Sequence, residues 1–179
     1  MFSTRRIALA LAVAGFPLGA QTQHSAANPM AASLQRSFAG VSGYILRAAD
    51  GFPADKYGYQ ATPDVRTFAQ ELTHVADAHF AYCSRARNEP SPQQSRIEGS
   101  MTDKAQIVAK LRESVEYCKG TYDAATDATL GEPFEVGRAR GVKLAVLVSN
   151  VTHDNEHYGK IVTYFRLNGM VPPSSQPRQ

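Results

Sequence analysis

The stretch His-Asp-Asn-Glu-His, residues 153–157, contains the residues of this chain best suited to metal chemistry. Two histidines four residues apart on a helix present their imidazoles on one side, about 6 Å apart at Cβ, and can bind neighbouring positions of one ion. His153 and His157 share a helix face with the apolar residues Val146 and Ile161. Imidazoles on such a face need a partner, since burying an unpaired polar group is costly.

The histidine pair alone does not require a metal, because hydrogen-bonded interior histidines or a solvated helix face have the same spacing. The zinc protease motif H-E-x-x-H is excluded, since Asp154 stands in place of its glutamate. The inverted motif H-x-x-E-H is matched, with Glu156 fourth, but it needs a further acidic ligand downstream, and neither Asp nor Glu follows His157. A third ligand must therefore come from upstream.

Two upstream histidines within the expected folded region are candidates for that ligand, His74 and His79. Both lie on one predicted helix, where His79 is in the middle of the apolar stripe and His74 toward its edge. Helical periodicity therefore favours His79. Asp77, one turn after His74, could orient an imidazole from behind or be a solvated acid.

The sequence predicts no specific role for the other polar residues near the histidine pair. Asp154 and Glu156 are expected to be surface acids, with Glu156 directed to solvent or to a neighbouring helix. Tyr158 and Tyr164 could line a pocket, although tyrosines in a helical bundle commonly serve in packing. No residue is assigned as a catalytic acid or base.

Four segments with helical periodicity must position these side chains. The first begins at Asn28 as an N-cap, with Pro29 in the first helical position, and the second repeats that start at Thr62 and Pro63. Both starts are followed by apolar residues at helical spacing.

The third and fourth helices have equally clear boundaries. A capping box formed by Ser100 and Asp103 precedes the third. The fourth extends from about Gly141 to Asn168 and is stopped by Gly169. Residues 127–140, rich in turn-forming positions, are expected to be a loop, and no alternating pattern indicates a strand.

The fold class predicted is therefore all-α, a four-helix bundle. Connections of roughly a dozen residues are longer than an up-down-up-down bundle needs, so a crossover connection could be present, and it would make the second and third helices parallel. Cys83 and Cys118 lie about equally far from the starts of those helices, so a disulfide between them requires the parallel arrangement. Two buried free thiols are the alternative.

The N-terminal segment has the pattern of a secretory signal. Arg5 and Arg6 precede the apolar run Ile7–Ala14, and small residues offer a cleavage point near Ala20. We expect an exported protein, periplasmic or secreted, by either the Sec or the Tat route; an uncleaved anchor is the alternative. The expected parts are a signal peptide at 1–20, a linker at 21–27, a four-helix bundle at 28–170 and a flexible tail at 171–179.

Length and charge narrow the remaining possibilities. A chain of 179 residues has room for one domain. Its formal net charge of +3 is small, and its basic residues are scattered among acids, so a nucleic-acid partner is excluded. Once the signal is removed, no stable membrane insertion is expected.

Two stretches resemble the DinB-like (DinB/YfiT) superfamily of metalloenzymes over essentially the whole chain after residue 28. "TFAQELTHVADAHFAY" resembles its second helix, in which an L-x-H-hydrophobic-A-[DE]-A motif supplies the first metal histidine. "HDNEHYGKIVTYFRLNGMVPPSS" resembles its last helix, with an H-x-x-x-H pair. The resemblance implies an up-down-down-up four-helix bundle and a site of His74, His153 and His157, with His79 left as a core or surface residue.

The resemblance also implies a divalent transition metal, Zn²⁺ or Ni²⁺ ahead of Fe²⁺ or Mn²⁺, and a small-molecule substrate. Three histidines leave an open coordination position, as in catalytic sites. The expected function is a metal-dependent enzyme of the hydrolase or thiol S-transferase type, in a chain that could form a homodimer. Members that act with low-molecular-weight thiols are mostly cytoplasmic, which conflicts with export. The alternative is a non-catalytic metal-binding or stress-response protein.

Overall fold

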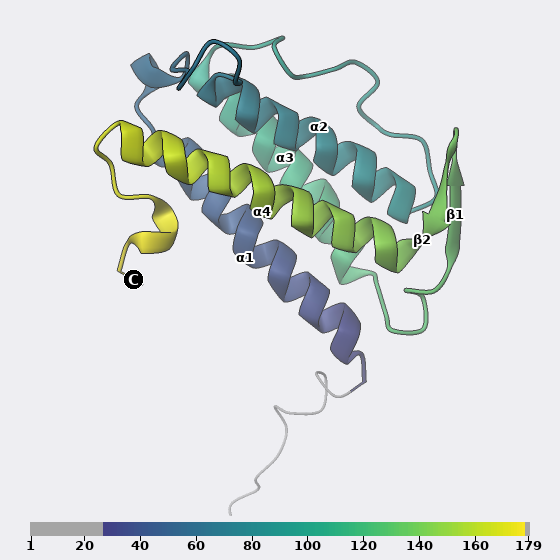
Figure 1. Ribbon diagram of the computed structural model, residues 1–179. Helices are drawn as coiled ribbons and strands as arrows, with labels where there is room; N and C mark the ends of the chain where they lie inside the picture. The colour runs from purple at the N-terminus through teal and green to yellow at the C-terminus, as the bar shows by residue number, and fades with distance from the viewer. Residues whose placement is uncertain (1–26, 178–179) are drawn as a thin grey trace, which may run out of the picture.

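The computed structural model describes residues 27–177 and contains an all-α four-helix bundle with one small hairpin (Figure 1). The predicted signal peptide and most of the predicted linker lie outside the described residues. The regular elements are α1 (Pro29–Gly51), α2 (Phe68–Ala86), α3 (Lys104–Asp123), β1 (Pro133–Val136), β2 (Ala139–Val142) and α4 (Lys143–Leu167), with short 3-10 helices at Ala54–Lys56 and Pro173–Ser175.

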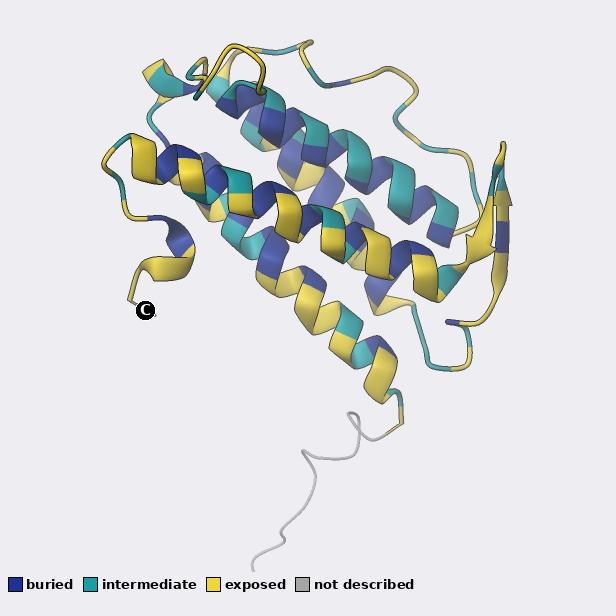
Figure 2. Ribbon diagram, viewed as in Figure 1, coloured by how far each residue is buried: buried dark blue, intermediate teal, exposed yellow. Residues whose placement is uncertain are grey.

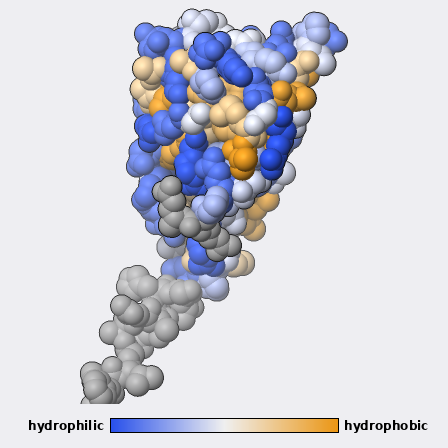
Figure 3. All heavy atoms as spheres, turned by 90° about the vertical axis from the view of Figure 1, so that its left-hand side faces the viewer, coloured by the Kyte–Doolittle hydropathy of each residue, from blue (hydrophilic) through white to orange (hydrophobic). Residues whose placement is uncertain are grey.

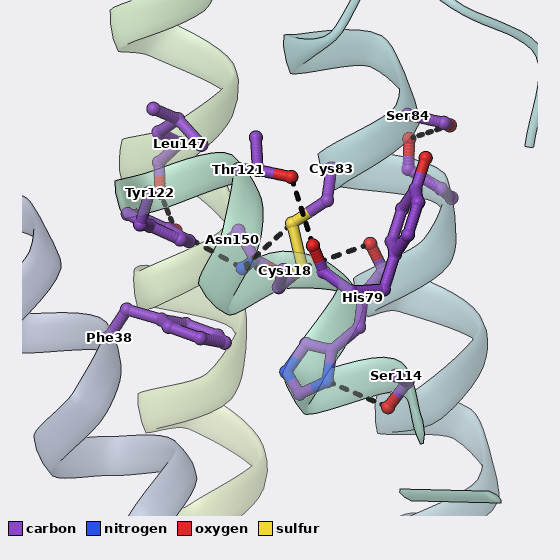
Figure 4. Close-up of a disulfide and its surroundings, with 12 residues drawn as sticks. Phe38, His79, Cys83, Ser84, Ser114, Cys118, Thr121, Tyr122, Leu147 and Asn150 are labelled. Atoms are coloured by element: carbon purple, nitrogen blue, oxygen red, sulfur yellow. Dashed lines mark hydrogen bonds between the residues drawn. A yellow bond between two sulfur atoms is a disulfide. The ribbon is translucent and has the colours of Figure 1, made fainter. Parts of the chain in front are cut away.

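The helices have the up-down-down-up order that the family resemblance implied, with the crossover that the long connections allowed. In Figure 1, α1 and α4 run from right to left and α2 and α3 from left to right, and the segment 87–103 returns along the bundle to join the parallel α2 and α3. Both α1 and α2 pack against α3 and α4. The Cys83–Cys118 disulfide ties α2 to α3 with a Cα–Cα distance of 5.3 Å (Figure 4).

The start of α2 differs from the prediction. The helix begins at Phe68, because Thr67 and Gln70 form a reciprocal capping box: the Thr67 hydroxyl accepts the Gln70 N–H at 3.2 Å, and the Gln70 side chain accepts the Thr67 N–H at 2.8 Å. This arrangement satisfies two backbone donors at once. The predicted start at Thr62 was therefore wrong, and residues before Thr67 form turns.

The starts of α1 and α3 also use other contacts than expected. Asp127 caps α1 from a distance: its carboxylate accepts the N–H groups of Met30 and Ala31, while the Asn28 side chain accepts the Asp127 N–H. The predicted capping box of α3 was wrong in its first member. Asp103 is the N-cap and accepts the Gln106 N–H at 2.9 Å.

A hairpin of β1 and β2 occupies part of the segment that was expected to be a loop. Its strands have four residues each and pair antiparallel through Val136 and Ala139, with Gly137 at φ +61° in the turn. A Cβ on Gly141 would lie 2.9 Å from the Phe134 ring, so the ring packs where only glycine fits. With one buried residue among eight, the hairpin has no alternating pattern to detect.

Residues 171–177 belong to the segment that was expected to be a flexible tail, but they pack on the bundle; the last two residues of that segment lie outside the described residues. Helix α4 ends before Gly169, which adopts φ +70°. Pro172 and Pro173 are buried, and the following turn contacts α1. The Ser174 N–H donates to the Tyr158 hydroxyl at 2.9 Å. Burial of the two prolines therefore fixes a segment whose composition suggested disorder.

The core lies between the four helices. Ile45, Leu72, Leu111 and Ile161 contribute one fully buried side chain from each helix, and Figure 2 shows buried stripes facing inward with exposed residues outside. Figure 3 shows one end of the bundle, a mostly hydrophilic surface with separate hydrophobic residues. Within residues 27–177 no helix has the length and apolarity needed to cross a membrane.

We predict that the disulfide stabilises the bundle strongly. It closes a loop across a sequence separation of 35 residues, so the Cys83→Ala/Cys118→Ala variant should lose about 3–4 kcal/mol of unfolding free energy. Urea denaturation of wild type and variant measures the loss. Adding a reductant should lower the unfolding free energy of the wild type but leave that of the variant unchanged. Equal unfolding free energies of wild type and variant would contradict the prediction.

Candidate metal centre

Three histidines meet between α2 and α4, which pack side by side (Figure 1). One ligand nitrogen each from His74, His153 and His157 lies within 4.8 Å of the others, and the Nε2 atoms of His74 and His153 are 3.1 Å apart. His157 is buried, whereas His74 and His153 are half-buried. The periodicity argument for His79 was wrong, and the histidine implied by the family resemblance is the one in this group.

A buried carboxylate orients His157. Glu71 is only 2% exposed, and its carboxylate accepts a hydrogen bond from His157 Nδ1 at 2.5 Å. Sequence reasoning missed Glu71. Its position three residues before His74 was the available signal, because side chains at that spacing are neighbours on a helix.

A second carboxylate orients His74. Glu98, in the segment between α2 and α3, accepts from His74 Nδ1 at 2.9 Å and also from Arg66 Nε at 2.9 Å and Arg96 at 2.6 Å. Burial alone would raise the pKa of Glu98, but these three hydrogen bonds lower it to about 2. Glu98 is therefore a carboxylate at neutral pH. No sequence pattern identified it, since it belongs to an irregular connection.

These contacts define the tautomers of two imidazoles. A carboxylate only accepts hydrogen bonds, so the Nδ1 atoms of His74 and His157 carry the protons, and their Nε2 lone pairs are left for a ligand. Burial lowers the pKa of His153 to about 4 and also lowers that of His74. Neutral imidazoles are the form that binds metals.

His153 differs from the other two histidines. Its Nδ1 is buried and has no hydrogen-bond partner, and its ring meets the edge of Tyr82 at a centroid distance of 5.6 Å. Its Nε2 faces His74 instead. The group thus has two imidazoles held by carboxylates and one held by packing.

Asp77 does not touch an imidazole, contrary to one of the two expectations for it. Its carboxylate accepts the backbone N–H groups of Ile97 and Glu98 at 2.8–3.0 Å. Ile97 is also buried, so residues 97–98 are held both by hydrogen bonds to Asp77 on α2 and by packing of the Ile97 side chain. Asp77 acts on the site only through Glu98, which in turn orients His74.

His79 belongs to a separate buried network. Its Nε2 lies 3.0 and 3.1 Å from the carboxylate oxygens of Asp154, its Nδ1 lies 3.0 Å from the Ser114 hydroxyl, and all three residues have no exposed surface (Figure 4 shows His79 and Ser114). The expectation that Asp154 is a surface acid was wrong, because a partner on α2 satisfies it inside the core. The network connects α2, α3 and α4.

The other residues considered from the sequence have ordinary positions. Glu156 is exposed and pairs with Lys160 at 2.8 Å, as expected. Tyr158 stacks on Tyr44 with a centroid distance of 5.2 Å. Tyr164 lines a cavity and donates its hydroxyl to the Arg66 carbonyl.

That cavity has a volume of about 640 Å³, and its wall includes the two carboxylates that hold His74 and His157 but none of the three histidines. Glu71 and Glu98 each contact one of these histidines and also line the cavity. The remaining walls come from residues 61–66, α2 and α4, and include Arg66, Gln70, Lys160 and Thr163. Volumes of this size accommodate small molecules.

Comparisons with known proteins identify the family and agree with this fold. The family model of the DinB superfamily matches residues 38–161, and the chain belongs to that superfamily. No curated protein sequence matches the chain.

Solved structures show the same fold at low sequence identity. A DinB-like protein from Bacillus cereus has 15% identity and a TM-score of 0.68, with 79% of this chain and 95% of that chain covered. A DinB-like protein from Bacillus subtilis has 18% identity and a TM-score of 0.66, covering 82% and 99%. A conserved protein from Enterococcus faecalis has 12% identity and a TM-score of 0.63, covering 77% and 96%.

The three imidazoles have the donor chemistry of a transition-metal site. Neutral imidazole nitrogens suit Zn²⁺, Ni²⁺, Fe²⁺, Co²⁺ and Cu²⁺. Hydrogen bonds from ligand imidazoles to carboxylates are the usual support of such sites. His74, His153 and His157 could therefore hold a metal ion, whose identity the donor set leaves open.

We predict that the buried network stabilises the bundle much more than the neighbouring surface acid does. Asp154→Ala leaves the His79 imidazole without its partner, so the variant should lose about 3 kcal/mol or more of unfolding free energy. Glu156→Ala, two residues away and exposed, should lose about 0.5 kcal/mol or less. Thermal or urea unfolding measures both, and similar losses in the two variants would contradict the assignment.

Proposed function

We propose that the protein binds one divalent transition metal through His74, His153 and His157, with Zn²⁺ or Ni²⁺ favoured. The observation that carries the proposal is the convergence of three ligand nitrogens within 4.8 Å. Support comes from the carboxylates behind His74 and His157, which point the remaining lone pairs inward.

We further propose a metal-dependent enzyme acting on a small molecule, of the hydrolase or thiol S-transferase type. Three protein ligands leave a coordination position open, as in catalytic zinc sites. A bound ion there would lower the pKa of a water or thiol and polarise an acceptor group. A cavity lined by Glu71 and Glu98, which hold two of the histidines, supports this function, since a site that only stores metal needs none.

A second candidate is a non-catalytic metal-binding protein. It is favoured by the use of the acids near the site: Glu71 and Glu98 both hold imidazoles. Among residues 27–177, Asp64 is the only other acid lining the cavity, and it is exposed. A catalytic base therefore has no dedicated carboxylate.

We propose that the protein works outside the cytoplasm, in the periplasm or as a secreted protein. The basic and apolar pattern of residues 1–20 supports export. The Cys83–Cys118 disulfide supports it independently, because such bonds persist mainly in oxidising compartments. Export separates the protein from cytoplasmic thiol pools, which favours the hydrolase type over thiol transfer.

The metal proposal predicts that His153→Ala/His157→Ala removes the ion. Elemental analysis should find about one metal ion per chain in the wild type and almost none in the variant, because one imidazole alone binds weakly. Glu156→Gln is the matched control: it changes the acid between the two histidines, and its metal content should equal that of the wild type. Equal metal content in wild type and double variant would refute the site.

The export proposal predicts removal of the signal. Protein recovered from the periplasm or medium should have an N-terminus close to residue 21, because small residues precede that position. Intact mass and N-terminal sequencing measure it. Replacing both arginines, Arg5 and Arg6, with lysine should block export only if the twin-arginine route is used. Full-length protein found only in the cytoplasm would contradict the proposal.

A further inference from the structure

We infer that Asn150 is a positioning residue of the metal centre: its amide oxygen accepts the Nδ1 proton that His153 carries when its Nε2 is a metal ligand. The inference rests on the proposed metal function and adds a residue to the same site. Three features support it: two buried polar atoms without partners on α4, the fixed direction of the Asn150 amide, and the tautomer of His153.

The two buried atoms are complementary. Within residues 27–177, the buried side-chain nitrogen and oxygen atoms without a hydrogen-bond partner are His153 Nδ1 and Asn150 Oδ1. Asn150 has no exposed surface. The two residues are three positions apart on α4, and side chains at this spacing are neighbours, about 5–6 Å apart at Cβ. A hydrogen bond from Nδ1 to Oδ1, direct or across one water molecule, would satisfy both atoms.

Neighbouring side chains define the direction of the Asn150 amide (Figure 4). The Tyr122 hydroxyl donates to the Leu147 carbonyl at 2.9 Å, so it accepts from Asn150 Nδ2, which lies 3.1 Å away. The sulfur atoms of Cys83 and Cys118 lie 4.0 and 3.8 Å from the same nitrogen. Nδ2 is therefore committed to the side of the disulfide, and Oδ1 is the atom of the amide that remains free to accept.

The tautomer of His153 depends on its Nε2. Because His74 Nδ1 donates to Glu98, His74 Nε2 has only a lone pair, and His153 Nε2, 3.1 Å away, donates to it. A metal-bound Nε2 has no proton, so the neutral ring must then carry its proton on Nδ1. One proton leaves Nε2 and one is taken up at Nδ1, with no net change. The buried Nδ1 of His153 thereby becomes a donor that needs an acceptor.

The carboxylates near His153 are already used. Asp154, the next residue in the chain, has its two oxygens 3.0 and 3.1 Å from His79 Nε2. The carboxylates that hold the other two ligand histidines are committed to them. Carbonyl oxygens serve as well as carboxylates in orienting a ligand imidazole. Asn150 is therefore the acceptor that the third imidazole of the site would otherwise lack.

The test is the zinc affinity of the mature protein, measured by competition with a chromophoric chelator. Asn150→Leu removes the acceptor at similar volume and should weaken zinc binding about tenfold, as expected for the loss of such a partner. Asn150→Asp keeps an acceptor oxygen and should retain the affinity. Val146→Ala is the matched control: it truncates a buried apolar side chain one turn earlier on α4, and it should bind zinc like the wild type.

A double-mutant cycle separates positioning from a general structural role. In His153→Ala no Nδ1 proton remains for Asn150, so adding Asn150→Leu should leave the weaker zinc affinity of that variant unchanged. An equal loss of affinity in both backgrounds would overturn the inference, because Asn150 would then support the helix and not His153. Undiminished affinity of Asn150→Leu in the wild-type background would overturn it too and leave the metal proposal standing.

Nitrogen-15 NMR of labelled histidines tests the position of the proton in the unmutated protein. His153 should carry its proton on Nε2 without metal and on Nδ1 with zinc bound. The same tautomer in both samples would overturn the inference without touching the metal proposal. Wild-type protein that binds neither zinc nor another transition metal would overturn both.

Discussion

The burial of a carboxylate against an imidazole is the constraint on which the candidate site depends. Glu71 is almost fully withdrawn from solvent between α2 and α4. A carboxylate in that position is tolerated only with a hydrogen-bond donor in reach, and His157 on the opposite helix provides it. A shift of α4 along α2 would break this contact, so the pair fixes the relative position of the two helices that carry the three histidines.

The topology of the bundle also helps to position the site residues. With α2 and α3 parallel, α4 lies antiparallel to α2, and the start of α2 faces the end of α4. The connection between α2 and α3 must then run the length of the bundle, and it brings Glu98 to His74 on the way. The Cys83–Cys118 disulfide, one turn after His79 on α2, fixes the positions of the parallel helices α2 and α3 along each other. The long crossover is thus both a structural necessity and the source of a site residue.

The helices and the pair His153 and His157 could be predicted from the sequence, because helical period and histidine spacing are local properties. The choice between His74 and His79 could not be made from periodicity. The apolar stripe identifies the most buried histidine, His79. A histidine buried that deeply is paired with a structural partner, here Asp154. His74 is half-buried at the edge of the stripe, so periodicity passed over it and only the family resemblance selected it.

Glu98, the hairpin and the packed C-terminal segment were missed because each depends on contacts between residues distant in sequence. The same class of contact governs the beginning of α1. Asp127, across 96 and 97 residues of chain, supplies the acceptors for Ala31 and Met30, and Asn28 returns a hydrogen bond to it. This clasp ties the first turn of α1 to the segment just after α3, so the end of one helix and the beginning of another are held by the same carboxylate. Replacing Asp127 would therefore loosen two ends of the bundle at once.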